Sequence, residues 1–105
     1  MRIRPEDCPI TPAFNLIGAK WTGLIIWHLL KGSLRYSELQ QALPGISPKT
    51  LAERLQTLEN EKLLERNVIP AKPPRVEYTL TQRGHALSEV FAAIERWVAL
   101  DRQLT

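Results

Sequence analysis

Residues 37–80 read SELQQALPGISPKTLAERLQTLENEKLLERNVIPAKPPRVEYTL, and this stretch decides the fold. At its centre the turn Leu43-Pro44-Gly45-Ile46 is followed by Ser47-Pro48. A serine side chain can accept a hydrogen bond from a free N–H at the start of a helix, and a proline at the first helical position needs no donor. A helix is therefore predicted to begin at Ser47, and its buried side is given by leucines at i, i+4 and i+7, namely Leu51, Leu55 and Leu58.

The opposite side of this helix is polar. The pattern predicts that five side chains project outward, namely Lys49, Thr50, Glu53, Arg54 and Thr57. A DNA major groove admits an α-helix, so this face is a candidate for base reading. Among these five side chains, Glu53 carries a negative charge. It would either accept a hydrogen bond from a cytosine amino group or orient Arg54.

The segments before and after this helix also have patterns that predict secondary structure. Ser37 and Gln40 match the first and last positions of a capping box, which predicts the helix before the turn. Residues 64–69 and 76–80 are β-branched or alternating and predict a β-hairpin, whose connection contains three prolines together with Lys72 and Arg75. Helix, turn, helix and hairpin in this order predict a winged helix-turn-helix, a mainly α fold with a small β-hairpin (α+β).

The ends of the chain are also expected to be helical. Thr11-Pro12 predicts a short helix to residue 17, residues 20–31 predict a helix buried on nearly every side, and residues 34–36 predict a short strand. Thr81 is predicted to cap one last helix with a wide apolar stripe. We expect the two terminal helices to form a homodimer through Phe14, Ile17, Phe91, Ile94, Trp97 and Val98, with packing inside one subunit as the alternative for part of this set.

Composition limits the classes of function. The chain has 105 residues, of which 44% are hydrophobic and 24% are charged, and this predicts a single domain over residues 1–105. A net charge of +3 favours a polyanionic partner only weakly. The longest apolar run, residues 21–30, has half the length of a bilayer crossing, so we expect a cytoplasmic protein without membrane contact.

Enzymatic readings find little support. Gly18 and Gly23 are spaced as in a phosphate-binding loop, but Leu24-Ile25 stands where lysine and serine or threonine would be needed. His28, His85 and Cys8 are scattered and form no metal-ligand or nucleophile motif. We therefore expect no enzymatic activity, no metal and no cofactor.

The single cysteine, Cys8, cannot form a disulfide within one chain. It precedes a helix that is expected at the dimer junction, so it is a candidate regulatory thiol that responds to oxidants or electrophiles. The helix N-terminus, Arg2 and Arg4 would favour its thiolate, whereas Glu6 and Asp7 would disfavour it. A buried, inert cysteine is the alternative.

Five blocks of sequence resemble the HxlR-type transcriptional regulators, which are related to MarR proteins. The blocks are Cys8-Pro9, residues 16–22 (LIGAKWT), residues 35–39 (RYSEL), residues 44–51 (PGISPKTL) and residues 73–81 (PPRVEYTLT). The resemblance covers nearly the whole chain. It implies a homodimeric winged helix-turn-helix regulator, with the helix after Ser47 in the major groove, the wing at Pro73-Pro74 on the backbone or minor groove, and the cysteine before the first helix as an oxidant or electrophile sensor in some relatives.

The expected partner is double-stranded DNA with a palindromic operator, because a two-fold dimer presents two recognition helices about 34 Å apart. We expect the sugar–phosphate backbone to be bound by Arg35, Ser37, Lys72 and Arg75, and the bases by Lys49, Thr50 and Arg54, with Ser47 at the helix start. A winged helix that binds protein is the competing class, because a fold alone does not fix function.

Overall fold

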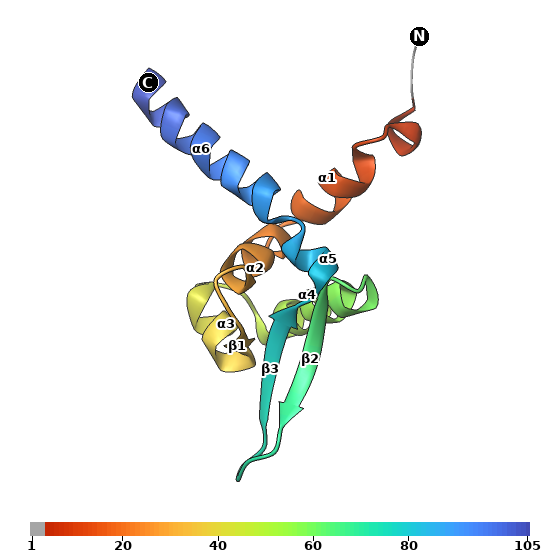
Figure 1. The fold of residues 1–105 in the computed structure, drawn as a ribbon, viewed down its shortest axis with the longest axis vertical. Coiled ribbons are helices and arrows are strands. Elements are labelled where there is room, and N and C mark those ends of the chain that lie inside the picture. The colour runs from red at the N-terminus through yellow and green to blue at the C-terminus, as the bar shows by residue number, and fades with distance from the viewer. Residues whose placement is uncertain (1–3) are drawn as a thin grey trace.

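A computed structural model describes residues 4–105 (Figure 1). Its elements follow in the order η1 (Pro5–Asp7), α1 (Thr11–Ile17), α2 (Thr22–Leu29), β1 (Leu34–Arg35), α3 (Tyr36–Ala42), α4 (Pro48–Asn60), β2 (Leu64–Ile69), β3 (Arg75–Leu80), α5 (Gln82–His85) and α6 (Ser88–Leu104). Helices α3 and α4 with the β2–β3 hairpin confirm the predicted winged helix-turn-helix. The fold is mainly α with a small antiparallel sheet.

The sheet has three strands in the order β1-β3-β2, all antiparallel. The hairpin register runs from Leu64 opposite Leu80 to Ile69 opposite Arg75, so the predicted wing is confirmed. The short strand predicted before α3 is β1, and it pairs Leu34 with Tyr78. The sheet thereby holds the wing firmly against the helical part of the domain.

The core lies between α2, α3, α4 and the sheet. The predicted stripe of Leu51, Leu55 and Leu58 is buried, and full burial of one such side chain stabilises the fold by about 1.5–3 kcal/mol. It packs with Ile25, Ile26 and Leu29 of α2, Leu39 of α3, and Tyr78 and Leu80 of β3. This packing fixes which side of α4 faces solvent.

Three predicted helix starts are wrong by one or two residues. The helix expected over residues 20–31 is α2, which runs only from Thr22 to Leu29. The expected capping box of Ser37 and Gln40 is not formed: α3 begins at Tyr36, and the Glu38 carboxylate accepts from the backbone N–H of Arg35 at 2.8 Å. The reason is that β1 continues to Arg35, so the chain passes from strand to helix without a free serine cap. Thr11 is the first residue of α1 and its hydroxyl bonds to the carbonyl of Pro5.

The single last helix predicted after Thr81 is also wrong. Thr81 caps α5, where its Oγ1 accepts from the N–H of Gly84 at 3.1 Å, but α5 ends at His85 and α6 begins at Ser88. Gly84 is buried, and a Cβ at this position would collide with the Leu63 carbonyl and lie 3.0 Å from the side chain of Leu80. Because α5 is pressed onto the sheet here, the chain must turn before α6 can leave the core.

Helices α1 and α6 project from the domain as two arms, on the side opposite the wing (Figure 1). The radius of gyration is 15.8 Å, whereas a compact chain of this length would have about 13 Å. The arms therefore lack the intramolecular cover that a compact subunit would give them. None of the helices described within residues 4–105 is both long and apolar enough to cross a membrane.

Candidate nucleic-acid interface

The start of α4 is held in place by its own side chains. Ser47 caps the helix as predicted: its Oγ accepts from the N–H of Thr50 at 3.1 Å and donates to Thr50 Oγ1 at 2.9 Å. Lys49, between them, is exposed. The polar groups that would meet a base edge are thus partly ordered before any partner binds, which lowers the entropy lost on binding.

The start of α3 is tied to the start of α4. The hydroxyl of Tyr36 donates to the carbonyl of Pro48 at 3.0 Å, and the intervening turn is closed by Gly45, whose φ of +93° suits glycine. Exposed Arg35 and Ser37 flank Tyr36 and therefore lie at the same end of the helix pair as Ser47. The sequence pattern alone did not identify Tyr36, because its partner is a backbone carbonyl in another helix.

The wing carries two exposed cations. Lys72 lies in the connection between β2 and β3, and Arg75 is the first residue of β3. Within residues 4–105, the ion pairs with N···O distances up to 4.0 Å involve only Arg4. The charges of Lys72 and Arg75 are therefore not neutralised by an acid of the part of the chain that is described.

The exposed face of α4 differs from the prediction at Arg54. Its side chain is half-buried, and Nε donates to the carbonyl of Lys20 in the α1–α2 loop at 3.3 Å. The face that points straight away from the core is formed by Lys49, Glu53 and Gln56, all exposed. Helical spacing explains the difference, because Arg54 lies three residues after Leu51 and four before Leu58 and is therefore beside the buried stripe. Gln56 was missed by the sequence analysis, although its spacing of seven residues from Lys49 is a usable signal.

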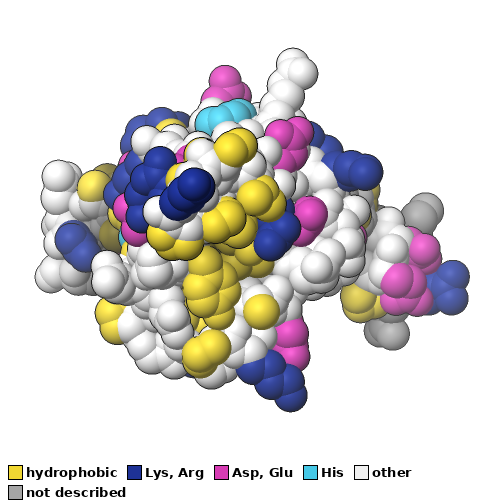
Figure 2. Space-filling model, turned by 90° about the horizontal axis from the view of Figure 1, so that it is seen from below, with side chains coloured by type: hydrophobic (Ala, Val, Ile, Leu, Met, Phe, Trp, Pro, Cys, Tyr) yellow, Lys and Arg dark blue, Asp and Glu magenta, His cyan; other side chains and the backbone are white. Residues whose placement is uncertain are grey.

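Positive side chains are spread over this end of the molecule. Seen from the wing end, lysine and arginine side chains lie in separate groups, with a strip of apolar side chains and several acids between them (Figure 2). No single continuous basic patch appears in this view. A polyanion would therefore be touched at several spaced points.

The residues predicted for the dimer fall into three environments. Phe14 and Trp97 are 60% and 61% exposed on the two arms. Ile17, Ile94 and Val98 line an apolar hollow between the arms and α2. Phe91 is only 8% exposed and belongs to the core of its own subunit. The alternative of packing inside one subunit therefore applies to Phe91.

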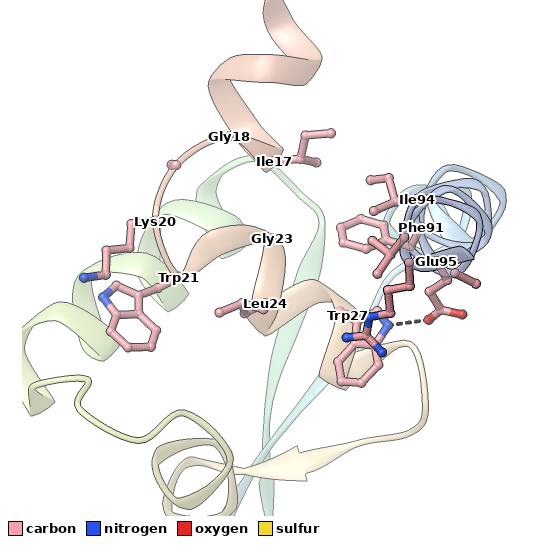
Figure 3. Close-up of a pocket in the computed structure, with 14 residues that line it drawn as sticks. Ile17, Gly18, Lys20, Trp21, Gly23, Leu24, Trp27, Phe91, Ile94 and Glu95 are labelled. Carbon is pink, nitrogen blue, oxygen red and sulfur yellow. Dashed lines mark hydrogen bonds between the residues drawn. The ribbon is translucent and has the colours of Figure 1, made fainter. Parts of the chain in front are cut away.

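The hollow has a volume of about 690 Å³ (Figure 3). Figure 3 shows Lys20 and Trp21 on the α1–α2 loop at one side, Leu24 between, and Ile94 and Glu95 of α6 at the other. The base of α6 is tied to α2 by a hydrogen bond from Trp27 Nε1 to Glu95 Oε1, and Lys31 Nζ lies 3.4 Å from the centre of the Trp27 ring. These contacts join α2 and α6 at one side of the hollow.

Cys8 lies between η1 and α1. It is a free, half-buried thiol, and its carbonyl accepts from the N–H of Thr11 at 3.0 Å. Arg4, expected to favour the thiolate, is paired with Glu6 and Asp7 at 3.6 and 3.1 Å. Arg2 lies outside the described residues. The charge of Arg4 is thus paired with those of two acids.

The histidines and acids form no candidate metal site. In the described part of the chain, no group of three or more His, Cys, Asp or Glu side chains is placed to hold a metal ion. His28 packs edge-on against Trp27 with ring centres 4.9 Å apart. Burial, with a smaller contribution from Lys31, lowers the pKa of His28. His28 is thus a boundary residue of the core.

Comparison with known proteins places this arrangement in a family. Residues 16–104 match the HxlR-like helix-turn-helix family. The chain is 43% identical over 93 residues to the HTH-type transcriptional regulator YvaP of Bacillus subtilis strain 168, with 88% of this chain and 86% of YvaP covered. It is 46% identical over 91 residues to the HTH-type transcriptional regulator YodB of the same organism, with 86% and 81% covered.

Comparison with solved structures leads to the same family of regulators. A MarR-family regulator from Porphyromonas gingivalis W83 superposes with a TM-score of 0.84 at 35% identity, covering 94% of this chain and 97% of that one. Reduced YodB superposes with a TM-score of 0.78 at 46% identity, covering 86% and 89%, and YodB has also been solved in diamide-treated and quinone-bound forms. Since the family match spans most of the sequence and its relatives are regulators and not enzymes, the chain belongs to the HxlR-like helix-turn-helix family of transcriptional regulators.

Proposed function

We propose that this regulator binds a specific double-stranded DNA sequence as a homodimer, with α4 in the major groove. The observation that carries the proposal is the ordered, exposed start of α4, where Ser47 holds Thr50 and leaves Lys49 free. In a helix-turn-helix domain this is the element that meets base edges. Lys49 and Thr50 are the proposed base readers, and the Gln56 amide, on the same exposed face as Lys49, is suited to adenine.

The proposed backbone contacts flank this helix on two sides. Arg35 and Ser37 would bind phosphates at the start of α3, and Lys72 and Arg75 would do so from the wing. Phosphate contacts fix the position of a protein on DNA but carry no sequence information. Loss of one of these cations should therefore weaken binding to all sequences alike.

The direct test is to recover and sequence the DNA fragments that the purified protein retains from a random library. Enrichment of a palindromic sequence, bound with an affinity that falls as salt rises, is the expected result. Retention of no sequence, together with no salt-dependent binding to any duplex, would refute DNA binding and favour a winged helix that binds protein.

The proposed dimer joins the two arms of one subunit to those of a second copy. Phe14 and Trp97 expose large apolar surfaces, and Ile94 is 42% exposed beside the hollow. Clusters of this kind are characteristic of protein–protein interfaces. A two-fold axis between the arms would place two α4 helices about 34 Å apart, on one face of a palindromic operator. Sedimentation at micromolar concentration should give the mass of a dimer, and a monomer would refute the proposal.

The proposed signal is modification of Cys8 by an oxidant or an electrophile. It is supported by the free, half-buried thiol just before α1, at the end of that arm that points away from the core (Figure 1), and by the diamide-treated and quinone-bound forms of the relative YodB. With one cysteine per chain, oxidation by diamide would join two subunits through a Cys8–Cys8 disulfide, and a quinone would add to the thiolate sulfur. Operator affinity should change after treatment of the wild type but not of Cys8→Ser, and equal affinity before and after treatment of the wild type would remove the hypothesis.

A further inference from the structure

The α1–α2 loop, residues 18–21, connects two parts of the molecule that have different roles. All four of its residues line the apolar hollow at the proposed subunit interface. Its last residue, Trp21, has a φ of +77°, a backbone conformation that is sterically unfavourable for a residue with a side chain. Such a conformation persists only where surrounding contacts hold it.

Those contacts come from the helix-turn-helix. The Trp21 ring lies 4.0 Å from the position that a Cβ of Gly45 would occupy, so it packs on the turn between α3 and α4. The carbonyl of Lys20 accepts from Nε of Arg54, in the second turn of α4, at 3.3 Å. Lys20 Nζ in turn lies 5.1 Å from the centre of the Trp21 ring. One short loop therefore contacts the hollow, the turn and the recognition helix.

We propose that Arg54 is a positioning residue: it fixes α4 to the α1–α2 loop, so that the packing of the second subunit in the hollow sets the orientation of the recognition helix. Arg54 then acts on DNA binding through Lys20 and not through a base edge or a phosphate. This inference rests on the proposed DNA-binding dimer. The initial expectation for Arg54 was contact with a base. In the present proposal the feature of the side chain that matters is the donor at Nε and not the charge.

Three substitutions separate these features. Glutamine places its Nε2 as many bonds from Cα as arginine places Nε, so Arg54→Gln keeps a donor for the Lys20 carbonyl and removes the charge. Methionine has the same length without a donor, so Arg54→Met removes both. Arg54→Lys keeps the charge but moves the donor one atom further out.

The experiment measures operator affinity of the three variants at one salt concentration, with sedimentation to confirm that each is a dimer. Positioning predicts that Arg54→Gln stays within about twofold of wild type, whereas Arg54→Met and Arg54→Lys weaken binding about tenfold, a loss within the range for one hydrogen bond. A phosphate or base contact predicts the reverse order, with Arg54→Lys closest to wild type and a shallower salt dependence for Arg54→Gln. That order would overturn the proposal.

A second measurement does not depend on DNA. The N–H of Thr22 bonds to the carbonyl of Ala19 at 3.2 Å and reports on the order of the loop. In the free protein, hydrogen exchange at residues 18–22 should be faster in Arg54→Met than in Arg54→Gln, because only the former loses the anchor. Equal exchange in the two variants would overturn the positioning role even if the operator were bound normally. Faster exchange in Arg54→Met than in Arg54→Gln, found together with a wild-type protein that binds no DNA, would instead count against the proposed function.

Discussion

Replacing Lys72 by glutamine removes one positive charge from the wing and leaves the fold unchanged, because this side chain is exposed and makes no ion pair in the described part of the chain. Three cations in each subunit are proposed to bind phosphates: Arg35, Lys72 and Arg75. A dimer then neutralises six phosphates, and each contributes about 0.9 to the slope of log affinity against log salt, which gives a slope of about −5. Lys72→Gln removes two contacts per dimer, so the slope should become shallower by about 2.

The consequence for affinity is large enough to measure. Between 50 and 200 mM salt the wild type should lose roughly 10³-fold in affinity, whereas Lys72→Gln should lose roughly 10²-fold. Fluorescence anisotropy with labelled operator over a salt series gives both slopes. The separate groups of cations seen from the wing end make this additive treatment reasonable, since they would touch the backbone at separate points (Figure 2).

Arg96→Gln is the matched control. Arg96 is exposed on α6, and this arm lies at the end of the molecule opposite the wing (Figure 1). Arg96→Gln also removes one positive charge, but far from the proposed DNA surface. The slope of log affinity against log salt for this variant should therefore equal that of wild type. A slope unchanged by Lys72→Gln, or changed equally by Arg96→Gln, would refute a phosphate contact by the wing.

Three further outcomes are expected. Trp97→Asp should give a monomer by sedimentation and weaken operator binding with an unchanged circular dichroism spectrum, because the Trp97 side chain is 61% exposed and its loss does not open the core; a stable dimer would contradict the proposed interface. Gly84→Ala should lower the free energy of unfolding by about 1–3 kcal/mol, since its methyl group would meet the Leu63 carbonyl and the Leu80 side chain, and an unchanged melting temperature would show that α5 does not press on the sheet as described. Because burial and Lys31 lower the pKa of His28 in the folded state, the unfolded chain takes up a proton first as pH falls below about 6.5, so stability should be fully present above that pH and decline below it; the urea midpoint of wild type should keep a constant offset from that of His28→Gln above this pH and fall relative to it below, and an identical decline in both proteins would contradict this.

The elements that the sequence predicted well are those with local signals. Ser47-Pro48 specifies the start of α4 through neighbours in the chain, and alternation specifies β2 and β3. The break between α5 and α6 has no such signal, because neither glycine nor proline occupies residues 85–88 and the turn is imposed by packing on the sheet. A similar reason explains why the partners of Arg54 and Tyr36 were not predicted: Lys20 and Pro48 lie in other elements, and periodicity, although it places Arg54 beside the buried stripe, contains no information about them.

The arms would allow so small a domain to respond to the proposed signal. Helix α6 has 17 residues, which is about 25 Å at 1.5 Å per residue, so a rotation of about 10° at its base would move its far end by about 4 Å. That base is held by Phe91 in the core and by the bond from Trp27 to Glu95. If the proposed dimer joins at the arms, a displacement of this size would be about one base-pair step, which is about 3.4 Å in a half-site spacing of about 34 Å. A modification of Cys8, which precedes α1 at the outer end of the other arm (Figure 1), would thus act on the part of that arm proposed to meet the second subunit and change the register of two recognition helices on DNA.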